Sequence, residues 1–306
     1  MPWIIAILVF LLITQIGLVI FSWRNAALSI HPRLIQKNYE IEWNRKKGLW
    51  RDFDSYTTKD YEIKGKDGYI LHATFVDNEE VRGSGKYVII LHGHTSSRYG
   101  AVKYLNSYIK LGFSCVIYDA RTHGDNAPDK CTLGNVEAED LLKVIEDTRN
   151  RFSDIKVLGL QGESMGSATS LTVTRYNPRI DFIVADCPFT GAHDVITDCY
   201  KKVYLHFLVP CIRLAGMILY KVDLNNTSAL KDLDNKNIPI LFIHGAGDTF
   251  ISPEHSKRLY EKASKSGAYT ELILVEGAGH ARCRYVAGFE KYTEYIENFL
   301  KKSGVL

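Results

Sequence analysis

The chain opens with a long apolar segment. No charged residue occurs between Trp3 and Trp23, where isoleucine, leucine, valine and phenylalanine predominate. As a helix that rises about 1.5 Å per residue, this segment reaches the ~30 Å of a bilayer core. The tryptophans stand at its ends, where interfacial anchors belong. We therefore predict a transmembrane anchor over residues 1–24; a cleaved signal peptide is the alternative, but a basic region before the segment and a clear cleavage site are lacking.

Basic residues follow the apolar segment, and none precedes it. They are Arg24, Arg33, Lys37, Arg45, Lys46 and Lys47. The positive-inside rule then predicts a single-pass protein of the cell membrane whose globular part is cytoplasmic. The same residues could instead lie along the anionic membrane surface as a stalk. Residues 25–59 mix aromatic and charged positions, which favours a helical linker that packs on the following domain.

From residue 60 to 306 the pattern is that of one globular domain. Two β-rich runs, 60–64 and 69–76, flank a glycine-bounded hairpin turn at 65–68. Short apolar runs then alternate with longer amphipathic ones. The predicted strands are 86–91, 114–118, 155–160, 182–185, 238–243 and 271–275, and the predicted helices are 99–111, 135–152, 164–176, 253–266 and 286–302. This alternation predicts an α/β fold with a mostly parallel central sheet and helices on both faces.

Composition narrows the function classes. A net charge of +3 over 306 residues gives no reason to expect nucleic acid as a partner. The sequence contains no Gly-x-Gly-x-x-Gly or phosphate-loop pattern, so no nucleotide cofactor is predicted. The six cysteines are scattered without a Cys-x-x-Cys pair, which predicts neither a zinc site nor a disulfide framework. We expect free thiols, no cofactor and no metal.

The sequence Gly162-Glu163-Ser164-Met165-Gly166 joins a predicted strand to a predicted helix. A serine on such a sharp turn must adopt a strained backbone conformation, and small residues two positions before and after it relieve the crowding. Glycine occupies both positions. We interpret Ser164 as a nucleophile exposed at the carboxyl end of the sheet, where ligands of such folds gather.

Two polar residues after later strands complete a catalytic arrangement. Asp248 and His280 each follow a predicted strand in a glycine-rich turn. Serine needs an adjacent base, usually a histidine that a carboxylate orients. The order serine, aspartate, histidine at separate strand ends therefore predicts Ser164, Asp248 and His280 as a triad. Asp186, just after an intervening strand, is the alternative acid.

A tetrahedral oxyanion needs two N–H donors aimed at it in advance. One is predicted to be the backbone N–H of Met165, directly after the nucleophile. The other is predicted to be the backbone N–H of His94, in the loop after strand 86–91. His92 is expected to brace this loop, and His92 with His94 is too sparse a pair for a metal site.

Together these motifs resemble the α/β-hydrolase superfamily over about residues 61–302, and more specifically bacterial single-pass-anchored serine esterase-like hydrolases. The resemblance lies in the segments Leu91-His92-Gly93, 119–124, Gly162-Glu163-Ser164-Met165-Gly166, Ala185-Asp186-Cys187-Pro188, His244-Gly245-Ala246-Gly247-Asp248 and Gly279-His280-Ala281. It implies the α/β-hydrolase fold, and it implies that the serine, aspartate and final histidine of these motifs form the triad.

An irregular helical insertion at about 189–237 is expected to form a small cap. Its apolar stretch 203–220 is broken at Pro210 and flanked or interrupted by charges, which argues against a second membrane span. It could also act as a lid that lines an acyl pocket or dips towards the bilayer.

The sequence thus predicts a membrane-anchored serine hydrolase that cleaves a small-molecule or lipid-like ester through an acyl-enzyme. A serine peptidase or acyltransferase of the same fold is one alternative. A catalytically idle, membrane-tethered binding module is the other.

Overall fold

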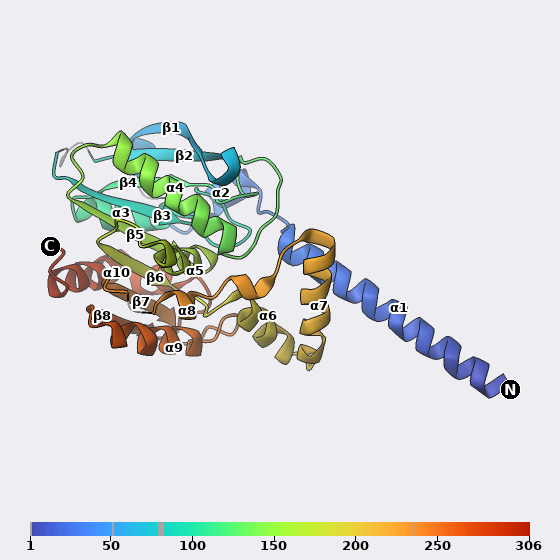
Figure 1. Ribbon diagram of the computed structural model, residues 1–306. Coiled ribbons are helices and arrows are strands. Elements are labelled where there is room, and N and C mark those ends of the chain that lie inside the picture. Colours follow the sequence, from blue (N-terminus) through green and yellow to red (C-terminus); the bar gives the residue numbers. More distant parts are fainter. Residues whose placement is uncertain (1, 51, 79–82, 235) are drawn as a thin grey trace.

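The computed structural model describes residues 2–50, 52–78, 83–234 and 236–306. Its centre is an eight-stranded sheet in the order β1-β2-β4-β3-β5-β6-β7-β8 (Figure 1). The strands are β1 Thr57–Lys64, β2 Ile70–Asp77, β3 Lys86–Leu91, β4 Ser114–Tyr118, β5 Val157–Glu163, β6 Phe182–Asp186, β7 Ile240–Gly245 and β8 Thr270–Val275. Strand β2 is antiparallel to both of its neighbours, and the remaining pairs are parallel. The predicted mostly parallel sheet is confirmed.

Helices cover both faces of the sheet. The α-helices of the described residues are α1 Pro2–Ile30, α2 Lys37–Lys46, α3 Val102–Lys110, α4 Asn135–Arg151, α5 Met165–Thr172, α6 Ala192–Lys201, α7 Val209–Ala215, α8 Ala229–Asp232, α9 Glu254–Ala263 and α10 Cys283–Lys302; those that cover the sheet include α3 and α10 on one face and α4, α5 and α9 on the other. Alternation along β3 shows why two layers form: Val88 and Ile90 pack in the core with α3 and α10, whereas Ile89 and Leu91 pack in the core with α4, α5 and α9. Successive side chains of a strand point to opposite faces, so an uninterrupted apolar run needs cover on both.

Several boundaries differ from the sequence-based prediction. Strand β5 continues to Glu163, beyond the predicted end at 160, because its last residues keep pairing with β6, as Gly162 does with Ala185. The helix predicted over 99–111 begins only at Val102. The predicted hairpin turn contains a short 3₁₀ turn over Lys66–Gly68 between two antiparallel strands.

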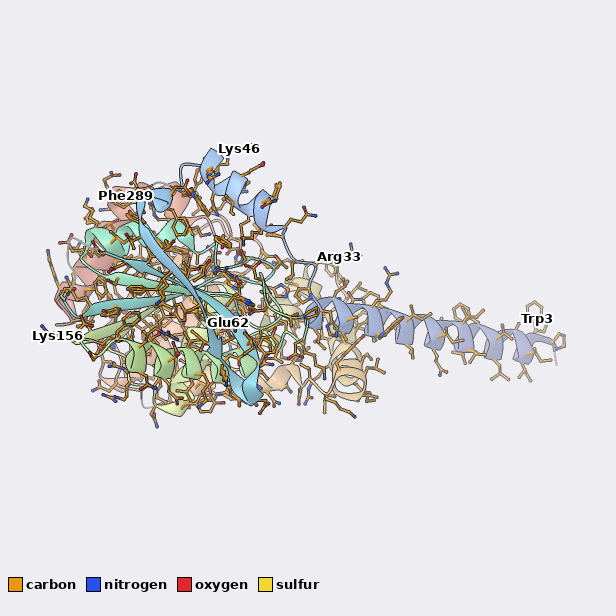
Figure 2. The ribbon with its side chains drawn as sticks, turned by 90° about the horizontal axis from the view of Figure 1, so that it is seen from above. Trp3, Arg33, Lys46, Glu62, Lys156 and Phe289 are labelled. Atoms are coloured by element: carbon orange, nitrogen blue, oxygen red, sulfur yellow. The ribbon has the colours of Figure 1, made fainter. Side chains whose placement is uncertain are left out.

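Helix α1 projects away from the domain. Trp3 lies at its far end and Arg33 lies where the chain turns back onto the domain (Figure 2). The helix continues to Ile30, and in the described part of the chain it is the one helix long and apolar enough to cross a membrane, by length and composition. A helix suits an apolar solvent because all of its central backbone groups bond within the segment. The division into anchor, linker and catalytic domain stays a prediction.

The insertion after β6 forms its own small layer. It contains α6, α7 and a wider helical turn, Gly216–Tyr220, that continues α7. Helix α7 packs beside the C-terminal half of α1 (Figure 1). This layer therefore contacts both the domain and the projecting helix.

Candidate active site

Ser164 stands on a strained turn between β5 and α5. Its φ is 53° and its ψ is −113°. A Cβ on Gly162 would lie 2.5 Å from the backbone of Gly166, and a Cβ on Gly166 would lie 2.6 Å from the carbonyl oxygens of Leu91 and His92. Both glycines are therefore required by close backbone approach. The sequence motif Gly-x-Ser-x-Gly reflects this packing.

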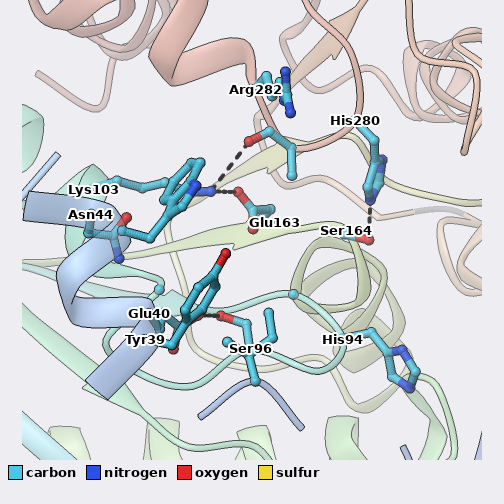
Figure 3. Close-up of a pocket in the computed structure, with 15 residues that line it drawn as sticks. Tyr39, Glu40, Asn44, His94, Ser96, Lys103, Glu163, Ser164, His280 and Arg282 are labelled. Atoms are coloured by element: carbon cyan, nitrogen blue, oxygen red, sulfur yellow. Dashed lines mark hydrogen bonds and ion pairs between the residues drawn. The ribbon is translucent and has the colours of Figure 1, made fainter. Parts of the chain in front are cut away.

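His280 joins Ser164 to Asp248. Its Nε2 lies 3.0 Å from Ser164 Oγ (Figure 3), and its Nδ1 lies 2.7 Å from Asp248 Oδ2. An imidazole protonated at Nδ1 satisfies both contacts, since it donates to the carboxylate and accepts from the hydroxyl. The structure thus brings together the three residues that the sequence predicts as a triad, and this geometry suits removal of the serine proton.

Asp248 is held as an anion by several donors. Its Oδ1 accepts the backbone N–H groups of Phe250, at 2.8 Å, and Ile251, at 2.9 Å. His244 Nε2 lies 3.3 Å from Oδ2. Burial alone would raise the pKa of Asp248, but the hydrogen bonds from His244 and His280 outweigh it and hold this pKa far below its ordinary value. The carboxylate is therefore ionised at neutral pH.

Asp186 occupies a different environment. Its carboxylate is fully buried and accepts hydrogen bonds from the hydroxyls of Tyr104, at 3.1 Å, and Tyr292, at 3.0 Å. Burial raises its pKa. The backbone oxygen of Asp186 accepts the N–H of Ser164 at 2.8 Å, so Asp186 stabilises the turn through its main chain. His280 has Asp248, rather than this alternative acid, as its carboxylate partner.

The two predicted oxyanion donors lie beside Ser164. The backbone of Gly93 packs against the serine, since a Cβ built on it would lie 3.6 Å from Ser164 Cβ. This contact places His94 next to the nucleophile, while Met165 begins α5 directly after it. Among the hydrogen bonds of the described residues, neither of these two backbone N–H groups donates to protein. Both remain free for a ligand.

Two cavities meet at Ser164. The first, here called the polar cavity for its charged side chains, has a volume of about 320 Å³; Glu40, Lys103, Glu163 and Arg282 line it together with the apolar surfaces of Ile35, Tyr39 and Trp43 (Figure 3). The second, the apolar cavity, has a volume of about 210 Å³, and its walls include Leu133, Phe189, Val195, Ile196, Phe250 and Ile251. His94 borders both cavities. A substrate spanning the serine would meet contrasting surroundings on its two sides.

Helix α2 forms one wall of the polar cavity, which the sequence did not reveal. Its Glu40 accepts hydrogen bonds from Ser96 and Ser97, and burial raises the pKa of this carboxyl group. Lys103 forms a buried ion pair with Glu163, the residue before the nucleophile. The aromatic residues scattered among charges in the predicted linker were the available signal for this packing, but such a pattern does not indicate which loop they cover.

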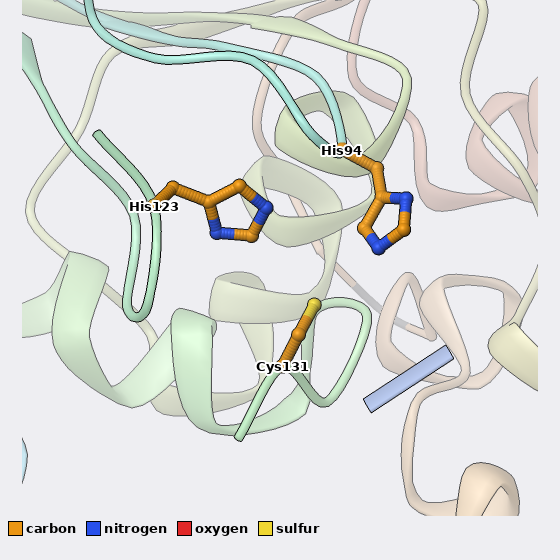
Figure 4. A group of neighbouring side chains, drawn as sticks. All are labelled: His94, His123 and Cys131. Atoms are coloured by element: carbon orange, nitrogen blue, oxygen red, sulfur yellow. The ribbon is translucent and has the colours of Figure 1, made fainter. Parts of the chain in front are cut away.

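His94, His123 and Cys131 form a cluster beside the apolar cavity (Figure 4). Their donor atoms lie within 4.8 Å of one another, and the Nε2 atoms of both histidines are buried without a hydrogen-bond partner among the described residues. Burial lowers the pKa of His94 to about 4, so its ring is neutral. A tetrahedral site with bonds of 2.0–2.3 Å holds its donors about 3.5 Å apart. The cluster has suitable donor types for a soft metal, at separations whose upper limit of 4.8 Å exceeds this value.

The sequence of this chain matches the model of a known protein family. Residues 107–304, well over half of the chain, match the model of the prolyl oligopeptidase family, peptidase S9. The chain belongs to the prolyl oligopeptidase family. It is accordingly a member of the α/β-hydrolase superfamily, as its motifs indicated.

Individual relatives agree with this assignment. The uncharacterised protein YqkD of Bacillus subtilis is 30% identical over 220 residues, which cover 70% of each chain. The lysophosphatidylserine lipase ABHD12 of Danio rerio is 21% identical over 270 residues, 83% of this chain and 64% of the relative. Among solved structures, the Pyrococcus furiosus esterase Pf2001 matches with a TM-score of 0.66 and 25% identity, covering 83% of this chain and 96% of that chain. These relationships support a hydrolase.

The two aspartates should respond differently to substitution. We expect Asp248→Asn to lower kcat by about 10⁴-fold, because the amide would hold His280 in the wrong tautomer. Asp186→Asn should cost less than about tenfold, since the hydroxyls of Tyr104 and Tyr292 can still donate to the amide oxygen. Hydrolysis of a chromogenic ester by both purified variants, with thermal unfolding as the control for folding, makes the comparison. An equal loss in the two variants would contradict the assignment of Asp248 as the acid.

Proposed function

We propose that this protein is a membrane-anchored serine hydrolase that cleaves esters of an apolar acyl group. The observation that carries the proposal is the contact of His280 with both Ser164 and Asp248, at the junction of an apolar and a polar cavity. The Pyrococcus furiosus neighbour is named as an esterase and the Danio rerio relative as a lysophosphatidylserine lipase, which agrees with an ester substrate.

The reaction uses the chain's own groups. Ser164 Oγ attacks the ester carbonyl while His280 Nε2 takes its proton, and Asp248 stabilises the imidazolium that forms. The N–H groups of His94 and Met165 bind the oxyanion, where one such donor is typically worth about 10²–10³ in kcat. His280 then gives the proton to the leaving alcohol as the C–O bond breaks. Water, activated by the same histidine, releases the acid from the acyl-enzyme.

The two cavities orient the substrate. The acyl chain would occupy the apolar cavity, whose volume of about 210 Å³ lies below the ~300–1,000 Å³ usual for drug-sized ligands. It therefore suits one acyl chain better than two. The alcohol would leave through the polar cavity, where Arg282 and the Lys103–Glu163 pair provide polar contacts.

Labelling of Ser164 tests the nucleophile directly. A fluorophosphonate probe should react with the purified full-length protein at Ser164, because His280 activates this hydroxyl. Peptide mass spectrometry locates the adduct, and Ser164→Ala should abolish it. Ser167→Ala is a matched control, since this nearby hydroxyl is buried and donates to the backbone oxygen of Asp186 at 2.7 Å. Folded protein that resists the probe would refute the proposal and favour an idle binding module.

The apolar cavity should select the acyl chain. Val195→Phe adds a ring to its wall, and we expect it to lower kcat/KM for an octanoyl ester by about 10–100-fold while an acetyl ester changes little. Val203→Phe, the same change at an exposed position, is the control. Equal effects on both esters would contradict the assignment of this cavity to the acyl group.

A peptidase is the second candidate, because the matched family model is one of peptidases. Matched ester and amide substrates with the same acyl group separate the two functions. Faster turnover of the amide would assign the site to peptide bonds. Added acceptor alcohols would reveal acyl transfer.

Helix α1 is proposed to span the cell membrane with the domain in the cytoplasm. The basic residues Arg24, Arg33 and Lys37 after the apolar segment support this orientation. Protease added to intact cells should leave the domain uncut, and permeabilised cells provide the control. Cleavage in intact cells would place the domain outside.

A further inference from the structure

The cap carries an exposed apolar surface next to α1. Helix α7 and the turn that continues it, Val209–Tyr220, are here called the foot. Leu214, Ile218 and Leu219 of the foot are 55%, 60% and 54% exposed. Together with Leu18 and Val19 of α1, they line a groove of about 330 Å³ between the two helices. Apolar side chains that face water contribute no free energy of burial, and a cluster of them on one surface marks a site of interaction.

The foot reaches a defined depth along α1. Trp23 Nε1 donates to the hydroxyl of Tyr220 at 2.9 Å, so these two aromatic residues lie at one level. Tryptophan and tyrosine favour the boundary between lipid headgroups and hydrocarbon. The groove extends from Trp23 to Leu18, which lies five residues closer to the N-terminus of α1. At 1.5 Å per residue, this distance along the helix axis is about 7.5 Å. Helices that lie in a membrane surface insert to about 5–10 Å.

The charges near the foot agree with a lipid environment. Arg213, the one charged residue of the foot, is neutralised by Asp223, with N–O distances of 2.7 and 2.8 Å. Exposed basic residues stand at the other side of the proposed boundary, Arg24 after the tryptophan of α1 and Lys221 directly after the foot. Lysine and arginine at this level are attracted to anionic headgroups.

We propose that the foot inserts beside α1 into the adjoining leaflet, so that the protein contacts the bilayer through two helices rather than through a single anchor. The partner of this surface is the lipid bilayer. The foot lies in its headgroup and outer acyl region, with Leu214, Ile218 and Leu219 among the acyl chains.

This placement brings the bilayer next to the apolar cavity. Ser29 of α1 lines that cavity, and Tyr200 of α6 donates to Asn25 of α1 at 2.5 Å. The helix that enters the membrane is therefore also part of the cavity wall. Resting on the proposed function, we infer that single-chain esters dissolved in the membrane reach Ser164 from the bilayer side.

Fluorescence from the foot tests its insertion. Cys211 is an exposed native thiol of the foot, and with Cys199→Ser in the background it can carry an environment-sensitive dye. In vesicles of phosphatidylcholine and phosphatidylglycerol, the full-length protein should show a blue-shifted emission and quenching by lipids with a nitroxide near the top of the acyl chain. The same dye on Lys257→Cys in α9, with Cys211→Ser, is the control and should show neither effect.

Two results would overturn the proposal. A dye on Cys211 that behaves like the control would place the foot in water. A dye shielded from aqueous iodide but insensitive to nitroxide lipids would show that a second protein copy covers the foot instead.

Substrate delivery provides a second measurement. The double variant Leu214→Glu and Ile218→Glu changes exposed side chains, and we expect the ratio of vesicle-borne long-chain ester hydrolysis to soluble acetyl ester hydrolysis to fall at least about tenfold. Leu306→Glu, at an exposed leucine on the domain, should keep the ratio. An unchanged ratio in the double variant would refute delivery from the bilayer. Absence of all ester turnover in the unmodified protein would instead refute the proposed function and leave the fluorescence test intact.

Discussion

The turn at Ser164 depends on backbone segments that come closer together than side chains would allow. A Cβ on either neighbouring glycine would meet main-chain atoms at about 2.5 Å, far inside the contact distance. This approach locks β5, α5 and the loop after β3 into one unit, and it holds Ser164 at a φ of 53°. The strained residue persists because the surrounding structure determines it. Every other part of the proposed site is positioned relative to this turn.

Around that turn, two carboxylates at the carboxyl ends of adjacent strands have opposite environments. Asp248 accepts backbone N–H groups and contacts two histidines, which favours its charge. Asp186 is surrounded by tyrosine hydroxyls in a fully buried layer, which favours its neutral form. The first environment suits a partner for a histidine that becomes charged during turnover. The second suits a structural support beneath the nucleophile.

The projecting helix and the cap extend this arrangement beyond the domain. Asn25 and Trp23 of α1 bond to Tyr200 and Tyr220 of the cap, so the membrane-spanning candidate and the cap form one layer. The apolar cavity lies between this layer and Ser164, since residues of α1 and α6 line it together with the serine. Under the proposed function, the anchor would contact the acyl chain directly, because Ser29 of α1 forms part of the cavity wall.

The sequence by itself determined the parts that follow from local pattern. Short apolar runs between longer amphipathic ones predicted the parallel strands, the paired glycines predicted the turn at Ser164, and glycine-rich strand ends pointed to Asp248 and His280. Only the tertiary structure decided between Asp248 and Asp186 as the partner of His280, because both follow strands and their separation from the imidazole depends on how the sheet is assembled. It also decided that α2 forms one wall of the polar cavity and that Val209–Tyr220 lies along α1. Such contacts join residues far apart in the chain, and a periodic pattern records which face of a helix is apolar but not what that face meets.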